Sequence, residues 1–134
     1  MPNVEKYSCY VFVHTHLSAI QKGVQAAHAV AELVNHETKL PIENQSVGFD
    51  QWIKKDKTMI FLDGGNTKQL WGKYHQFALE DSRNGQDSLP YIWREDAETL
   101  GTLVTAFAVI FKSNCSGGSI REQIIRDCSL LRAT

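Results

Sequence analysis

The sequence has few of the features of secreted proteins, of proteins stabilised by bound metal, or of proteins that bind nucleic acid through an overall positive charge. Its three cysteines, Cys9, Cys115 and Cys128, are odd in number and lack the spacing of a metal site. Fourteen basic residues stand against fifteen acidic ones, which gives a formal net charge of -1. Because no overall positive field attracts nucleic acid, any RNA contact must come from a local patch.

Long hydrophobic runs are also missing. No apolar stretch approaches the roughly 20 residues that a membrane span needs, so no membrane partner is expected. The first residues carry neither the charged nor the apolar part of a secretory signal, and the expected compartment is the cytoplasm. The 134 residues contain no repeat or low-complexity segment. They therefore predict a single domain over 1–134, with a core that needs no disulfide, metal or other cofactor.

The segment 17–36 carries the most informative pattern. Wound as a helix at about 100° per residue, Gln21, Gln25, His28 and Glu32 fall within roughly 60° of one another. Apolar residues occupy the rest of the circumference: Ile20, Val24, Ala26, Ala27, Val30, Ala31, Leu33 and Val34. This predicts a helix buried on most sides, with one polar stripe that faces either water or a cleft.

The first half of the chain predicts a strand and a helix followed by a long connection. Residues 7–14 are nearly continuous in hydrophobicity, which indicates a central strand buried on both faces. Ser18 with Gln21 forms a capping-box pattern, and the helix is expected to end at about Asn35 or His36. Residues 37–57 are polar, and their obvious apolar anchors are Phe49, Trp52 and Ile53.

The second half predicts three more strands. Residues 58–63 are a short buried strand, closed by two glycines and by Asn66, a candidate cap for the helix that follows. Strands are expected over 90–93 and 103–111, separated by an acidic connection over 94–101, and a last helix follows 116–119. Alternating strands and helices favour an α/β three-layer sandwich: a mixed, mostly parallel sheet of about four strands with helices on both faces.

Two stretches of this sequence, LSAIQKGVQAAHAVAEL over 17–33 and WREDAETLGTLVTAFAV over 93–109, carry a family resemblance. In local sequence pattern and in the order of their predicted elements, residues 6–112 resemble the peptidyl-tRNA hydrolase type 2 fold family. The likeness is greatest to its small phage and bacterial homologues. The resemblance implies ester hydrolysis on stalled peptidyl-tRNA, a four-stranded sheet and often a homodimer. For a phage-encoded member, the cytoplasm would be that of the host.

The resemblance also points to site residues. Family members carry a lysine four residues before the helix glutamine; here that position is Gln21, and the lysine follows it as Lys22. They also carry an aspartate with a threonine four residues later, where this chain offers Asp96 with Leu100 or Glu95 with Thr99. The predicted catalytic residues are Lys22 for positive charge, Asp96 to orient water and the hydroxyl of Thr105. The predicted substrate-binding residues are Gln21, Gln25, His28, Glu95 and Thr99.

Each of these residues also has a structural interpretation. Lys22 can be a solvated first-turn residue, Gln21 can be one half of the helix cap, and His28 can be a packing residue partnered by Glu32. His14 and His16 share a strand face, but no third ligand completes a metal site, and none is assigned.

A basic cluster, Lys54, Lys55 and Lys57, follows Trp52 and offers two interpretations. It either holds RNA with the indole stacked on a base, or is a solvated loop with the indole in the core.

Three functions remain open from the sequence. The leading hypothesis is a peptidyl-tRNA hydrolase-like enzyme that acts at the tRNA 3′ end. The second is a non-catalytic protein of the same fold that binds a nucleotide-like small molecule, such as a phage protein that sequesters a host signalling nucleotide. The third is a dimerising interaction module whose polar stripe faces solvent.

Overall fold

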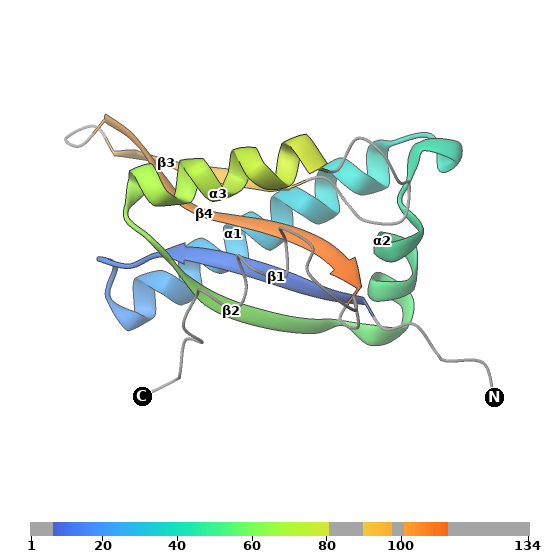
Figure 1. Ribbon diagram of the computed structural model, residues 1–134. Helices are drawn as coiled ribbons and strands as arrows, with labels where there is room; N and C mark the ends of the chain where they lie inside the picture. Colours follow the sequence, from blue (N-terminus) through green and yellow to red (C-terminus); the bar gives the residue numbers. More distant parts are fainter. Residues whose placement is uncertain (1–6, 81–89, 98–100, 113–134) are drawn as a thin grey trace.

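The computed structural model describes residues 7–80, 90–97 and 101–112 (Figure 1). In chain order the elements are β1 (Tyr7–His14), α1 (Ala19–Lys39), the 3-10 turn η1 (Ile42–Asn44), α2 (Val47–Gln51), the π-helical turn η2 (Trp52–Asp56), β2 (Thr58–Gly65), α3 (Thr67–Glu80), β3 (Tyr91–Ala97) and β4 (Gly101–Lys112). This is the α/β sandwich that the sequence predicts, with α1 behind the sheet and α3 in front of it in Figure 1.

The four strands lie in the order β2-β1-β4-β3. Strand β1 is internal, as expected, and all eight of its residues are buried. It pairs in parallel with β2 and antiparallel with β4, while β3 pairs antiparallel with β4. The sheet is therefore mixed, and the expectation of mostly parallel strands was wrong.

The reason for this difference lies between β3 and β4. Strand β3 continues to Ala97 and β4 begins at Gly101, so most of the predicted acidic connection is itself strand. A parallel pairing needs a crossover of a dozen or more residues, whereas a gap this short joins only antiparallel neighbours.

Two clusters of side chains hold the helices on opposite faces of the sheet. On the α1 side, Val11 and Val13 of β1 and Ala106 of β4 pack with Ala29 and Leu33 of the helix. The α3 side is built around aromatic rings: Phe12, Phe77 and Phe107. The rings of Phe12 and Phe107 stack with centroids 4.6 Å apart. Successive residues of a strand therefore pack into the cores on opposite faces of the sheet, which fixes the register of the strands.

Helix α1 begins where the sequence predicts and differs in its burial. The Ser18 hydroxyl accepts the backbone N–H of Gln21, which confirms the cap, and the helix continues to Lys39. Its buried residues lie on one face: Gln25, Ala26, Ala29, Leu33 and Glu37. Ile20 is 79% exposed and Val24 is 42% exposed, so the expectation of burial on most sides was wrong. Among the described elements, α1 packs mainly against the sheet, so its opposite face remains exposed.

The polar segment 37–57, which the sequence predicts as a long connection, is mostly helical. It forms the last turn of α1 and three short helical turns, and Phe49 and Trp52 anchor it in the α1-side core. The indole N–H of Trp52 donates to the carbonyl of Thr58 at 2.8 Å, and the side chain is 3% exposed. Trp52 therefore has the core role, and its indole is not available to stack on a base.

Helix α3 begins with a reciprocal cap. The side-chain oxygen of Asn66 accepts the backbone N–H of Gln69, and the side-chain oxygen of Gln69 accepts the backbone N–H of Asn66, both at 2.9 Å. This confirms Asn66 as the cap that the sequence predicts. Just before it, Gly64 lies so close to Leu70 that a Cβ atom would be 2.3 Å from a leucine methyl carbon. The glycine is needed because β2 and α3 approach closely here.

Candidate functional site

A bulge in β4 turns one polar residue toward α1. Trp93 of β3 pairs with Ala106, and the next residue, Arg94, pairs with Val104, so Thr105 is the extra residue. Val104 packs in the α3-side core and Ala106 in the α1-side core. Thr105 faces α1 as well, because its hydroxyl bonds to a residue of that helix. Bulges commonly redirect a side chain in this way next to functional sites.

The hydroxyl of Thr105 donates to the side-chain oxygen of Gln25 at 2.8 Å. The amide nitrogen of Gln25 lies 3.5 Å from the side-chain oxygen of Gln21, a long and weak hydrogen bond. Gln25 is 4% exposed and Thr105 is 2% exposed, whereas Gln21 lies at the surface. A chain of neutral polar groups therefore runs from the sheet to the surface, and Thr105 holds the orientation of Gln25 from beneath.

One turn further along α1, His28 stacks on an aromatic ring of β3. The ring centroids of His28 and Trp93 are 4.4 Å apart and the rings are 10° from parallel. His28 is exposed and Trp93 is half-buried. Together they form a flat surface beside Gln25. The sequence identified His28 but not Trp93, although the aromatic residues at positions 91 and 93 alternate as expected for one strand face.

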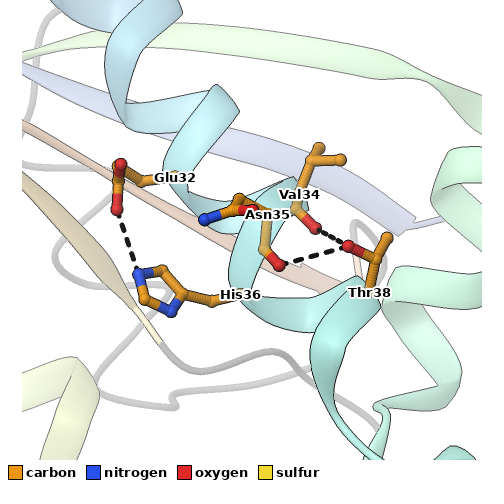
Figure 2. A network of polar contacts seen from close by, with 5 residues as sticks. All are labelled: Glu32, Val34, Asn35, His36 and Thr38. Atoms are coloured by element: carbon orange, nitrogen blue, oxygen red, sulfur yellow. Dashed lines mark hydrogen bonds and ion pairs between the residues drawn. The ribbon is translucent and has the colours of Figure 1, made fainter.

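The far half of the polar stripe forms a second stacked pair. His36 lies over Tyr91 with centroids 5.3 Å apart, and its Nε2 lies 3.0 Å from a carboxylate oxygen of Glu32 (Figure 2). Glu32 therefore pairs with His36, and the suggested pairing of Glu32 with His28 was wrong. Figure 2 also shows the hydroxyl of Thr38 donating to the carbonyls of Val34 and Asn35 near the end of the helix.

The predicted catalytic residues lie on both sides of this arrangement. Lys22 is half-buried in the first turn of α1, three residues before Gln25, so the two side chains are neighbours on the helix surface. The backbones of Glu95 and Asp96 lie in β3, opposite Leu103 and Thr102. Asp96 is three residues beyond Trp93, about 10 Å along the strand at its usual rise. Thr99 lies outside the described residues.

His14 and His16 meet at the end of β1 in an arrangement that ties β1 to α3. The ring Nδ1 of His14 accepts the backbone N–H of His16, and its Nε2 lies 3.1 Å from the hydroxyl of Thr67. Burial, reinforced by the positive charge of His16, lowers the pKa of His14, and Asp63 opposes this only in part. With Nδ1 accepting, the proton sits on Nε2 and points at Thr67, so the imidazole cannot take a proton from that hydroxyl.

Within residues 7–80, 90–97 and 101–112, no three His, Cys, Asp or Glu residues cluster as a metal site. The thiol of Cys9 is buried, which raises its pKa to about 12, so Cys9 is not a nucleophile at neutral pH. Cys115 and Cys128 lie outside the described residues. Among the described residues, the groups left as candidates for the site are those of the α1 stripe and of the strands beneath it.

Comparisons with known proteins do not place the chain in a family, because no protein-family model matches it and a search of curated proteins finds no similar sequence. Separately, none of the described helices is long and apolar enough to cross a membrane.

Proposed function

We propose that the protein is a peptidyl-tRNA hydrolase-like enzyme that cleaves the ester between a peptide and the 3′ end of tRNA. The observation that carries the proposal is the hydrogen bond between Gln25 and Thr105, which are 80 positions apart. The helix stripe singles out Gln25, and the family resemblance singles out Thr105. Their contact joins α1 to the bulge of β4, which supports the proposal that the residues around them act together.

The reaction needs a water nucleophile, a cation for the developing oxyanion and a grip on the RNA. Water oxygen attacks the ester carbonyl carbon, the carbon–oxygen bond to the ribose breaks, and the proton that the water loses ends on the ribose oxygen. In this proposal the ammonium of Lys22 stabilises the oxyanion and the carboxylate of Asp96 orients the water. Thr105 is a positioning residue, because its proton is committed to Gln25 and its side chain is buried.

The stacked pair of His28 and Trp93 gives the site a surface for the RNA. Single-stranded nucleic acid binds on flat aromatic surfaces, and stacking contributes about 1–3 kcal/mol per base. The terminal base of the tRNA would stack here. The exposed amide of Gln21 can donate to and accept from the ribose hydroxyls or a phosphate. This local surface supplies a base contact despite the slightly negative charge of the chain.

The same surface supports a second candidate function. The exposed amide of Gln21 offers a neutral hydrogen-bonding group, and His28 and Trp93 offer a stacking face, which suit a nucleotide whether or not it reacts. A non-catalytic protein of this fold, such as a phage protein that sequesters a host signalling nucleotide, would use the site in this way. It predicts a nucleotide-dependent rise in Tm, because a ligand bound by the folded state alone stabilises that state.

Incubation of the protein with peptidyl-tRNA separates the two candidates. The hydrolase is expected to release the peptide as a free acid and to leave tRNA with an intact 3′ hydroxyl, faster than the reaction without protein. A matched substrate with an amide in place of the ester is the control for ester chemistry. No release, together with a rise in Tm on adding nucleotides, would reject the hydrolase and support the binding protein.

A further inference from the structure

Strand β2 forms one edge of the sheet. Among the described residues it pairs only with β1, so every second residue of β2 points its N–H and C=O groups outward. Such an edge is a ready template for another strand, and proteins commonly protect it with charges, prolines or a covering segment. Residues 58–62 read Thr-Met-Ile-Phe-Leu and contain neither a charge nor a proline.

The face of β2 on the α1 side is apolar and open. Met59 is 47% exposed and Phe61 is 39% exposed. They lie on this side because the alternate residues, Ile60 and Leu62, pack with the α3-side core. Helix α1 packs mainly over β4, β3 and β1. Two large apolar side chains therefore border the unpaired edge.

Charges of opposite sign lie at the two ends of this apolar segment. Lys57 is exposed and immediately precedes β2, and Asp63 lies near the end of the strand. Suppose that the β2 strands of two copies pair antiparallel about a two-fold axis. Residues that lie opposite each other then share a face of the sheet, and the two residue numbers of every opposite pair add up to the same even sum. A sum of 118 places the charged Lys57 opposite the apolar Phe61, and a sum of 122 places the apolar Met59 opposite the charged Asp63. A sum of 120 sets Met59 against Phe61 and Lys57 against Asp63.

We propose that a second copy of this chain docks on the β2 edge, antiparallel and in the register that pairs Met59 with Phe61. The contact is the same for both copies and joins their sheets into one continuous sheet of eight strands, four from each copy. It covers both open edges, buries the four apolar side chains and brings each Lys57 beside the Asp63 of the other copy. The stacked pair of His28 and Trp93 lies away from this interface, because β3 forms the opposite edge.

The oligomeric state of the full chain tests the interface. Sedimentation equilibrium is expected to give twice the chain mass for the wild type and the single chain mass for Phe61→Lys, which places a charge in the middle of the interface. Ile20→Lys is the matched control: Ile20 is more exposed than Phe61 but lies on α1, so this variant should stay dimeric. A monomeric wild type, or a dimer that survives Phe61→Lys with unchanged dissociation, overturns the proposal.

Cysteine pairing tests the register. In a background with Cys115 and Cys128 replaced by serine, a mixture of Met59→Cys and Phe61→Cys proteins should form a disulfide-linked heterodimer under mild oxidation. Either protein alone should not, because identical positions then lie diagonally, about 7–8 Å apart and beyond disulfide reach. The native Cys9 is buried and its thiol pKa is about 12, so it stays out of the reaction. Efficient linkage of either protein to itself would overturn this register.

A covering segment of the same chain is the remaining alternative. Hydrogen exchange of the backbone amides in residues 58–65 distinguishes it, since protection by a second copy should grow with protein concentration. Protection of equal strength at all concentrations would show that the chain covers its own edge, and would overturn the proposal.

Discussion

Replacement of Lys22 by alanine is expected to lower the rate of peptide release by about 100- to 1,000-fold, the loss typical of one oxyanion-stabilising group. The half-buried side chain is in the first turn of α1, beside Gln25, and is the cation that the proposed mechanism requires. Stability should change little, because alanine is a good helix former. Single-turnover release of peptide from peptidyl-tRNA measures the effect.

Lys39→Ala is the matched control for this prediction. Lys39 is an exposed lysine in the last turn of the same helix, far from the proposed site. Its replacement removes the same charge from the protein and should leave the rate unchanged. Asp96→Ala should slow release as well, since it removes the group assigned to orient the water. If the Lys22 and Asp96 variants both retain full activity, the catalytic assignment is wrong even where the wild-type protein is a hydrolase.

Replacement of Thr105 by valine is expected to destabilise the fold by about 1–3 kcal/mol, the usual effect of leaving a buried polar group without its partner. The variant keeps the shape of the side chain and removes the hydroxyl that bonds to Gln25 at 2.8 Å. Gln25 is 4% exposed, so water cannot easily replace the lost hydroxyl. The change in the free energy of unfolding is read from urea titrations at constant m value.

A double-mutant cycle shows whether the contact itself is responsible. Gln25→Leu alone should also destabilise the protein, because it leaves the Thr105 hydroxyl unpaired. The double variant replaces both partners with apolar groups, so it should be less destabilised than the sum of the two single variants. Additive effects would mean that the two residues do not interact in solution.

The local features of the fold could be predicted because local chemistry decides them. The caps at Ser18 and Asn66 and the buried strand over 7–14 follow from residues within a few positions of one another. The prevalence of antiparallel pairing in this mixed sheet could not be predicted from hydrophobicity alone, since a buried parallel strand and a buried antiparallel one have similar patterns. The antiparallel pairing of β3 with β4 follows from the short gap between Ala97 and Gly101. The prediction of 94–101 as a connection made this gap look longer than it is.

Residue periodicity alone could predict the candidate site only from its helical side, whereas strand residues such as Thr105 were predicted from the family resemblance. Helical periodicity by itself brings Gln21, Gln25 and His28 onto one stripe. The partner strand contributes through the bulge at Thr105, and a bulge has no simple sequence signature here, because no glycine marks it. The stacking of His28 on Trp93 also depends on which strand lies beneath the helix. Helical periodicity gives no information about that neighbour.

The central claim is that the polar stripe of α1 and the strands beneath it form one site for the 3′ end of an aminoacylated RNA. The chain has three tryptophans, so its nitrogen–proton NMR spectrum contains three indole signals. The signal that disappears in the Trp93→Phe variant is that of Trp93. On addition of an aminoacyl-adenosine with an amide in place of the ester, the indole signal of Trp93 should shift. Those of the buried Trp52 and of Trp71 on α3 should stay in place. A saturating titration that leaves Trp93 unmoved, or that shifts only Trp52 or Trp71, would contradict the account.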